Sequence, residues 1–350
     1  MVVAYSGRVP AEQVVRLEDR SAGLDGVIVI HSTALGPAAG GCRLWHYPSF
    51  DQAAEDAFRL AEGMSYKNAM AGLPFGGGKA VLRHPVGDFD RSALFRAFGR
   101  AVAELGGRYV TAEDVGTRVS DMQDVAGATQ HVTGLEAKPG GLGGNPSPRT
   151  AKGVFDAMKS AASFALETDL RGLRVAVQGI GNVGGELCRL LADAGAELTI
   201  ADVSPARRDR VATILGARVV DVDDIAAADV DVFAPCALGG VLDERSVGAM
   251  KAKLVCGGAN NQLATPDVAD MLLDRGITYV PDYVANAGGI ISVTAEYLDE
   301  SAALVDMRVA QIGPRVATIL DEARRRRLSP AVVADRMAER LIAQGVRRVA

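Results

Sequence analysis

Two lysines, Lys67 and Lys79, lie 12 positions apart, each preceded by glycine: Gly63 before the first and Gly76-Gly77-Gly78 before the second. If both lysines line one cleft, each lowers the pKa of the other, and burial lowers both pKa values further. One lysine could then stay charged and hold a carboxylate, while the other acts as a neutral base near pH 7. The alternative is that both are ordinary surface residues.

A carboxylate, Asp114, follows a short strand-like run at residues 108–111. It could move a proton or orient the second lysine, or it could simply cap a helix. The glycines before Lys79 are not a P-loop, because Ala80 stands where a serine or threonine would be needed to hold magnesium. We expect instead that these three glycines have positive φ and allow a close approach to a small ligand. An earlier glycine-rich run, Gly36–Arg43, follows the first strand-like run.

Another glycine-rich stretch fits the pattern G-x-G-x-x-G, with Gly179, Gly181 and Gly184 as its glycines and Asn182 and Val183 between the last two. An apolar strand-like run precedes it and a helix-like run follows, which is the context that dinucleotide binding requires. The first glycine makes a tight turn, the second lets a pyrophosphate approach the backbone, and the third lets helix and strand pack closely.

An acidic residue, Asp202, ends the next strand-like run, about 20 residues beyond this fingerprint. A carboxylate at this place accepts hydrogen bonds from the adenosine ribose and repels a 2′-phosphate. The sequence therefore favours NAD over NADP. Arg207 and Arg208 follow shortly after and could bind a phosphate, which leaves use of both cofactors open.

The elements that must position these residues follow from the spacing of apolar side chains. Residues 27–30 are β-branched and indicate a strand, while the apolar positions between residues 50 and 64 share one helix face. Strand-like runs then alternate with helix-like stretches, at residues 174–178, 197–202, 229–234, 253–257 and 276–280. This alternation predicts a parallel sheet covered by helices on both faces. Residues 302–349 look helical, and residues 133–149 have the Gly/Pro content of a linker or functional loop.

Composition narrows the class of protein. The 350 residues are 48% hydrophobic and carry a net charge of −5, which suits two globular domains and argues against nucleic acid or an anionic membrane as a partner. No apolar run reaches the length of a membrane span, and no basic-then-apolar leader begins the chain, so we expect a cytoplasmic protein. We expect the four cysteines to be free thiols and see no cluster with metal-ligand spacing.

Seven motifs, in order, resemble the leucine/valine/phenylalanine dehydrogenases, a branch of the Glu/Leu/Phe/Val amino-acid dehydrogenase family. The motifs are LGPAAGGCRLW from Leu35, GMSYKNAMAGLPFGGGKAV from Gly63, GRYVTAEDVGT from Gly107, VQGIGNVG from Val177, DVFAPCALGG from Asp231, GGANNQL from Gly257 and PDYVANAGG from Pro281. Several motifs in register are far more specific than any one of them.

The resemblance implies NAD-dependent oxidative deamination of an L-amino acid to a 2-oxo acid and ammonium. Lys67 matches the lysine that binds the substrate carboxylate, helped by the asparagine that matches Asn261. Lys79 matches the general base that activates water, and Asp114 matches the aspartate that exchanges protons with the amino group. The carbonyl of Gly41 matches one that accepts a hydrogen bond from that amino group.

The resemblance also assigns positions around the cofactor and the substrate side chain. Thr150 and Asn286 match positions near the nicotinamide, and Ala237 matches one near the cofactor ribose. The substrate side chain would contact apolar residues, namely Ala39, Ala112, Ile290 and Val293, with Met64 nearby. None of these is charged, so glutamate is disfavoured as a substrate.

The choice among apolar amino acids stays open between two groups. An alanine at position 39 makes room, as in phenylalanine-type enzymes. The stretches Thr111–Asp114 and Lys67–Leu73 look like those of the leucine and valine branch, and Ile290 narrows the pocket. A methylene or two gives only about 1–3 kcal/mol of discrimination. We favour branched-chain substrates, with phenylalanine or another aromatic amino acid as the alternative.

The predicted fold is α/β with two domains. Residues 1–135 would form an α/β domain with the substrate and catalytic groups, and residues 136–328 a doubly wound, parallel-sheet (Rossmann) domain for NAD. The C-terminal helices, residues 329–350, could pack back on the first domain. The resemblance implies a homo-oligomer. Two rival functions fit the sequence less well: an NAD-sensing regulator without catalysis, which would have lost Lys79 or Asp114, and a 2-hydroxy-acid dehydrogenase, which would need a histidine base.

Overall fold

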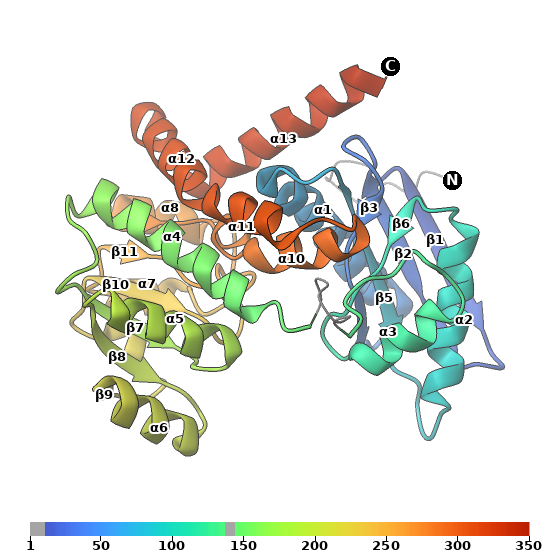
Figure 1. Cartoon of the computed structure of the whole chain (residues 1–350), viewed down its shortest axis with the longest axis horizontal. Coiled ribbons are helices and arrows are strands. Elements are labelled where there is room, and N and C mark those ends of the chain that lie inside the picture. Colours follow the sequence, from blue (N-terminus) through green and yellow to red (C-terminus); the bar gives the residue numbers. More distant parts are fainter. Residues whose placement is uncertain (1–10, 137–143, 350) are drawn as a thin grey trace. The chain divides into compact units, whose positions relative to one another are not determined.

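The computed structural model describes residues 11–136 and 144–349, with side chains up to residue 345 (Figure 1). The chain divides into two compact units. Unit 1 comprises Met1–Gly144, Ser292–Ala302 and Met337–Ala350, and unit 2 comprises Asn145–Ile291 and Ala303–Arg336. The division falls inside helix α10 (Gly288–Tyr297). Each unit is described by itself.

Unit 1 is built on a mixed six-stranded sheet. Its main path runs β1 (Gln13–Asp19), β2 (Leu24–Ser32), β5 (Gly76–Arg83), β3 (Ala38–Ala39) and β6 (Tyr109–Val110), and β4 (Cys42–Trp45) also pairs with β5. The first two pairings are antiparallel, whereas β3 and β4 run parallel to β5. Strand β5, which carries Lys79, is therefore at the centre of the sheet.

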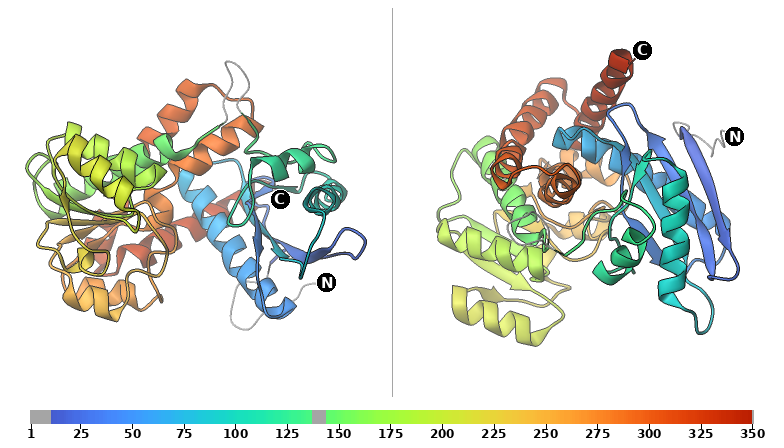
Figure 2. Two further views of the ribbon diagram at one scale, coloured as in Figure 1. Left: turned by 90° about the horizontal axis from the view of Figure 1, so that it is seen from below. Right: turned by 45° about the vertical axis from the view of Figure 1, so that its right-hand side comes forward.

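Helices cover both faces of this sheet, as the uninterrupted apolar run of β2 requires. Successive strand residues point to opposite faces. Val27 and Val29 pack in a core with α1 (Phe50–Ala71). Ile28 and Ile30 pack in another core with α2 (Arg91–Glu104) and α3 (Val119–Ala126). Figure 2 shows α1 and the α2/α3 pair on either side of the strands (left view).

Helix α1 extends beyond the stretch that the apolar spacing predicted. Its N-cap is Ser49, whose hydroxyl accepts from the N–H of Gln52, and it ends at Gly72, which has φ +68°. The last turns bury polar side chains, and this is why the apolar pattern stopped at residue 64. Ser65 contacts His31 Nδ1 at 2.8 Å, and Asn68 donates to the carbonyl of Gly76 at 2.6 Å.

Unit 2 confirms the predicted doubly wound sheet, with all six strands parallel. The order is β12 (Thr278–Tyr279), β11 (Leu254–Val255), β10 (Val232–Pro235), β7 (Arg174–Gln178), β8 (Glu197–Ala201) and β9 (Arg218–Val219). The chain starts at β7, moves outward to β9, and then returns to the other side of β7. The topological switch point thus lies between β7 and β10, where ligands of such sheets bind at the carboxyl ends of the strands.

Helices cover the two faces of the second sheet. α4 (Ser147–Ala165) and α5 (Asn182–Asp193) lie on one face, and α12 (Ile312–Arg326) packs on α4. The 3₁₀ turn η1 (Ile225–Ala227), α7 (Glu244–Ala249) and α8 (Val268–Asp274) form a core with the other face. The remaining helices are α6 (Pro205–Leu215), α9 (Asp282–Ala285), α11 (Ala302–Ala310) and α13 (Pro330–Val349). None of the helices in the described part of the chain is long and apolar enough to cross a membrane.

Candidate active site

The structure brings Lys79 and Asp114 together in unit 1. Lys79 Nζ lies 2.9 Å from Asp114 Oδ2, and the lysine is only 4% exposed. Asp114 follows β6, and its backbone N–H donates to Thr117 Oγ1 at 2.8 Å. Helix α3 begins only after Arg118. The alternative in which Lys79 is a surface residue and Asp114 a helix cap is therefore wrong.

The charge of Asp114 is stabilised by two cations. Besides Lys79, Arg43 Nε donates to the same oxygen, Oδ2, at 3.0 Å. Burial by itself raises the pKa of this carboxyl, but the charges and hydrogen bonds of Lys79 and Arg43 outweigh it and hold the pKa below the ordinary value of 3.8. Asp114 is thus an ionised proton acceptor at neutral pH.

The expected positive φ angles are wrong for the glycines before Lys79. None of Gly76, Gly77 and Gly78 has one. Gly76, Gly77 and Gly78 lie inside strand β5, and a Cβ at Gly77 would overlap the backbone N of Ser65 on α1. These glycines allow the strand to pack closely against its neighbours and do not form a turn. The same holds for Gly41, whose Cβ would lie 2.5 Å from Glu113 O and 2.9 Å from Asp114 Cβ.

The other residues assigned to the substrate headgroup lie on both units. Lys67 is half-buried on α1. The carbonyl of Gly41 accepts from the N–H of Ala80 and from the hydroxyl of Tyr109, both at a long 3.3 Å. Asn261, in unit 2, is exposed and has φ +52°, a left-handed conformation that asparagine tolerates. Its carbonyl accepts from Gly240 N–H at 2.7 Å, which fixes its backbone.

Four of the five apolar residues expected in the side-chain pocket belong to unit 1. Ala39 is buried on β3, and Asn68 Nδ2 holds its carbonyl at 3.3 Å. Met64 lies beside the next residue, since a Cβ at Gly40 would come within 3.2 Å of Met64 Cγ. Met64, Ala112 and, on α10, Val293 are half-buried. The fifth, Ile290, is half-buried on the part of α10 in unit 2.

The fingerprint glycines of unit 2 differ in what they pack against. Gly179 turns after β7 with φ +86°, and a Cβ there would lie 2.7 Å from that of Ala237, which follows β10. A Cβ at Gly184 would overlap the carbonyl of Gly179. Gly181, the N-cap of α5, has no atom of the described residues within 4 Å of its Cβ position. Packing thus explains the first and third glycines, whereas the second leaves free space at a helix N-terminus, as a phosphate would require.

Asp202 stabilises the backbone of the glycine turn that follows β7. It is 6% exposed, and its carboxylate accepts from the N–H groups of Ile180 and Ser204 at 2.9 and 2.8 Å. Arg207 lies 3.6 Å from the same carboxylate, with a half-exposed side chain. A cavity of about 790 Å³ opens beside the turn, and its lining includes Gly181, Asn182, Arg207 and Arg210.

The two residues assigned near the nicotinamide also belong to unit 2. Asn286 is 3% exposed and donates to Asn260 Oδ1 at 2.8 Å, while its own Oδ1 is buried and finds no hydrogen-bond partner among the described residues. Thr150, on α4, donates to Pro146 O at 3.1 Å and lies against Gly289. An unpaired buried oxygen requires a donor. The carboxamide N–H of a nicotinamide would supply one, so these residues fit such a cofactor.

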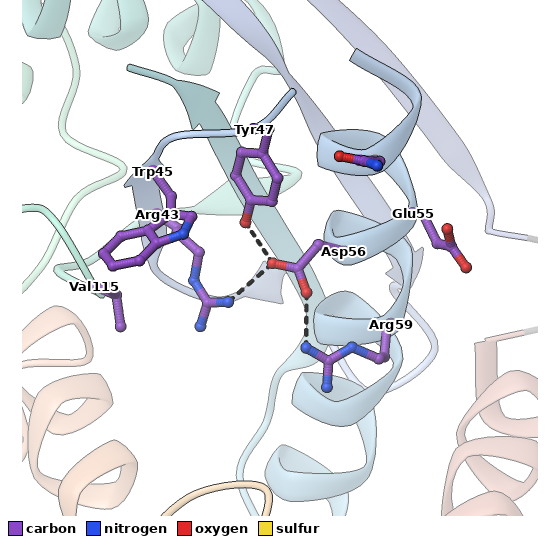
Figure 3. A pocket seen from close by; sticks show the side chains of 8 residues that line it. Arg43, Trp45, Tyr47, Glu55, Asp56, Arg59 and Val115 are labelled. Atoms are coloured by element: carbon purple, nitrogen blue, oxygen red, sulfur yellow. Dashed lines mark hydrogen bonds and ion pairs between the residues drawn. The ribbon is translucent and has the colours of Figure 1, made fainter. Parts of the chain in front are cut away.

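One group of residues near Lys79 and Asp114 was missed by the sequence analysis. Arg43 donates to Asp114 and to Asp56 on α1. Figure 3 shows Asp56 in contact with Arg43, Tyr47 and Arg59. Arg43 stood within a recognised motif, but nothing in the spacing indicated a link to a carboxylate 13 positions further on. The sequence feature that could have identified Arg43 was its positive charge close to the glycine pair Gly40 and Gly41.

Neither a metal site nor a disulfide is found in the part of the chain described here. The described residues contain no cluster of histidine, cysteine and acidic side chains that could hold a metal ion. The four cysteines are free, and burial raises the pKa of Cys236 to about 11. This thiol is therefore neutral at physiological pH.

Comparison with known proteins places these observations in context. The model of the Glu/Leu/Phe/Val dehydrogenase dimerisation domain matches residues 11–131, and that of Glutamate/Leucine/Phenylalanine/Valine dehydrogenase matches residues 200–331. The chain is 46% identical to leucine dehydrogenase of Geobacillus stearothermophilus, over 95% of this chain and 90% of that protein. It is also 46% identical to valine dehydrogenase of Streptomyces virginiae, over 94% and 92%. Among solved structures, L-tryptophan dehydrogenase from Nostoc punctiforme superposes with a TM-score of 0.86 at 37% identity, covering 96% of this chain and 97% of that one.

Proposed function

Because the chain belongs to the Glu/Leu/Phe/Val dehydrogenase family, we propose that it catalyses the reversible, NAD-dependent oxidative deamination of an apolar L-amino acid, with branched-chain substrates preferred. The observation that carries the proposal is the buried pair of Lys79 and Asp114, an amine and an ionised carboxylate 2.9 Å apart. Near-complete coverage of relatives named leucine and valine dehydrogenase supports the substrate class.

Each polar residue has one task in the proposed reaction. Lys67 and Asn261 bind the substrate carboxylate, and Asp114 takes a proton from the amino group, which the carbonyl of Gly41 helps to orient. The bound nicotinamide supplies the hydride acceptor. Lys79 first releases to solvent the proton that it carries in the ion pair with Asp114, and the neutral amine then takes a proton from the water that attacks the substrate imine carbon. The nitrogen of the adduct is reprotonated and leaves as ammonia, which becomes ammonium in solution, while the hydroxyl loses its proton to form the 2-oxo acid. The short distance between Lys79 and Asp114 allows a proton to pass between them.

The preferred substrate is tested with an amino-acid panel. Initial rates of NADH formation are measured with L-leucine, L-valine, L-phenylalanine, L-tryptophan and L-glutamate. We expect the highest kcat/KM with a branched-chain substrate, and with glutamate a value lower by about 100-fold or more, because its carboxylate would be buried without a partner. A preference for glutamate, or no NADH formation with any of the five, would contradict the proposal.

The aromatic amino acids are the second candidate class. Ala39 is small and buried, and the L-tryptophan dehydrogenase structure is similar at 37% identity. If Ala39 lines the pocket, Ala39→Leu lowers kcat/KM for phenylalanine more than for valine, because the added methylenes fill space that the larger substrate needs. Equal losses for both substrates would remove Ala39 from the pocket.

NAD is proposed as the nicotinamide cofactor. Gly181 would face its pyrophosphate, Asp202 its adenosine ribose, and Asn286 its carboxamide. The carboxylate of Asp202 should repel a 2′-phosphate, so we expect kcat/KM with NAD to exceed that with NADP by at least about tenfold, which corresponds to about 1.4 kcal/mol. Arg207→Ala should lower any residual NADP activity and leave the NAD activity nearly unchanged.

A homo-oligomer is proposed from the match of residues 11–131 to a dimerisation domain. Light scattering on the purified chain should give a mass that is a multiple of 36.5 kDa. A mass of one chain at micromolar concentration would contradict this part of the proposal.

A further inference from the structure

Arg43 joins two carboxylates that are far apart in the sequence. Its Nε donates to Asp114 Oδ2 at 3.0 Å, and its Nη1 donates to Asp56 Oδ2 at 2.9 Å. The side chain is 18% exposed. Because a guanidinium is planar and rigid, two carboxylates held by different nitrogens of one fork are fixed relative to each other. Strand β4 and helix α1 therefore jointly determine where Asp114 lies.

Asp56 fixes the Nη1 end of the Arg43 guanidinium. Its Oδ2 accepts from both Arg43 and the hydroxyl of Tyr47, the latter at 2.5 Å, and its Oδ1 accepts from Arg59 at 2.7 Å (Figure 3). These hydrogen bonds hold the pKa of Asp56 below its ordinary value of 3.8, although burial alone would raise it. Asp56 is thus an ionised acceptor held by three donors, and Arg43 has little freedom to turn away from Asp114.

The two carboxylate oxygens of Asp114 differ in the donors that contact them. Oδ2 receives both Lys79 Nζ and Arg43 Nε, at 2.9 and 3.0 Å. Among the described residues, no donor reaches Oδ1. A carboxylate pinned through one oxygen presents the other in a defined direction, and proton transfer depends on such alignment.

We propose that Arg43 is a positioning residue for Asp114: together with Asp56 it fixes Oδ2 and leaves Oδ1 as the oxygen that exchanges a proton with the substrate amino group. The inference rests on the proposed function, because it concerns the same reaction. Arg43 cannot itself carry protons, since its guanidinium does not lose one in proteins. It acts through orientation and through its charge.

The charge of Arg43 should affect the pH dependence of the enzyme's activity. The groups that face Asp114 are Lys79 on β5, Arg43 and Cys42 on β4, and Tyr109 on β6. Burial raises the pKa of the Cys42 thiol and of the Tyr109 phenol, so both stay neutral and only the two cations act. When the cation at position 43 is removed, the pKa of Asp114 rises, and the acidic limb of the activity profile moves to higher pH.

A cavity beside Arg43 makes a direct rescue experiment possible. It has a volume of about 520 Å³, and Arg43, Tyr47, Asp56 and Arg59 are among the residues that line it (Figure 3). If Arg43 is truncated to alanine, guanidinium from solution can enter this cavity and occupy the place between the two carboxylates.

The test compares Arg43→Ala with the wild-type enzyme in the assay that forms NADH. We expect kcat to fall about 100-fold, the effect of misplacing a reacting group by about 1 Å, while KM for the amino acid changes less than about threefold. The acidic limb of the profile should shift upward, and millimolar guanidinium should restore part of kcat. Lys79→Ala should not be rescued. Arg83→Ala, which removes an arginine of β5 that pairs with Asp25 at 2.7 Å, should retain the wild-type kcat.

The outcomes separate this inference from the proposed function. If the wild-type chain forms no NADH with any amino acid, the proposed function fails. If the wild type is active and Arg43→Ala keeps its kcat and profile, or loses kcat without any guanidinium rescue or pH shift, the positioning role is overturned. If Arg43→Ala does not fold, Asp56→Asn tests the contact between Arg43 and Asp56 instead. The expected loss of kcat is about tenfold. Wild-type kcat in that variant would also overturn the inference.

Discussion

Gly77 sits in the tightest contact between a strand and a helix near the candidate site. A Cβ at this position would overlap Ser65 on α1. We expect Gly77→Ala to lower the free energy of unfolding by about 3 kcal/mol, because the core has no room for the extra methyl group. Gly63, on the same helix, has no atom of the described residues within 4 Å of its Cβ position. Gly63→Ala should therefore stabilise the protein by about 0.5–1 kcal/mol. Urea denaturation of both variants checks this, and equal effects would contradict it.

The role of Lys79 makes a separate prediction. If it is the general base, Lys79→Ala should lower kcat by about 10²–10⁴-fold, the usual contribution of such a group. The variant should still bind NADH, since the cofactor residues belong to unit 2. Fluorescence titration with NADH provides that control. A kcat near that of the wild type would show that another group takes the proton from water.

Single residues were predictable from sequence only where a motif contained them. The motifs pointed to Lys79 and Asp114, and the structure places them in contact. Arg43 and Asp56 could not be paired, because their contact depends on how β4 and α1 pack together. The glycines before Lys79 were identified correctly as special, but for the wrong reason: glycine permits both positive φ and close packing, and only the three-dimensional neighbours tell which is used.

At the scale of elements, a buried ion pair joins α2 to α3. Asp121 is 1% exposed, accepts two hydrogen bonds from Arg91 at 2.8 and 2.7 Å, and also accepts from the N–H of Arg118 at the start of α3. Removing one partner of a buried pair leaves the other charge without compensation.

We therefore expect Asp121→Ala to destabilise the protein by about 3 kcal/mol. Glu18→Ala, which removes an exposed partner of Arg20, should change stability by less than about 0.5 kcal/mol. Thermal or urea denaturation measures both variants. A small effect of Asp121→Ala would show that Arg91 finds another acceptor.

Helices and strands were easier to predict from the sequence when their apolar residues recur at a regular spacing. Five of the six strands of unit 2 are largely buried, and each of the five predicted runs overlaps one of them. The sixth strand, β9, is exposed and was not predicted. The sequence analysis did not identify β1, since its residues QVVRLED mix charged and apolar side chains on a partly exposed strand. It also placed the end of α1 too early, because Ser65 and Asn68 are polar yet buried.

The pH dependence of stability is a property of the whole molecule. Burial lowers the pKa of His31 below its ordinary value of 6.5, and its Nε2 has no partner among the described residues. As the pH falls below 6.5, the unfolded chain takes up a proton at His31 that the folded chain does not, so the free energy of unfolding decreases. Further stability is lost as the pH falls through 3.8, because Asp114 and Asp56 become protonated in the unfolded chain while their lowered pKa values keep them ionised in the folded chain.

Urea denaturation at a series of pH values tests the contribution of His31. The wild type should lose stability between pH 6.5 and 5, and His31→Gln should reduce that slope. His84→Gln is the matched control, because His84 is half-buried and pairs with the carbonyl of Pro85 through Nδ1. If the slope in this pH range is the same in His31→Gln and wild type, His31 does not account for it.

The two-unit division of the chain also shows what sequence periodicity cannot provide. Periodicity distinguishes helices from strands, but the assignment of Ser292–Ala302 and Met337–Ala350 to unit 1 depends on contacts between residues distant in the chain. Thr133, for example, donates to Val293 O at 2.7 Å, across 160 positions.

The crowded start of strand β5 has a practical meaning for protein engineers. Methyl groups cannot be added at Gly76 or Gly77 without displacing the main chain of Ser32 or Ser65. Combinatorial libraries that seek new substrates should therefore leave these two glycines unchanged and randomise the half-buried positions Met64 and Ala112.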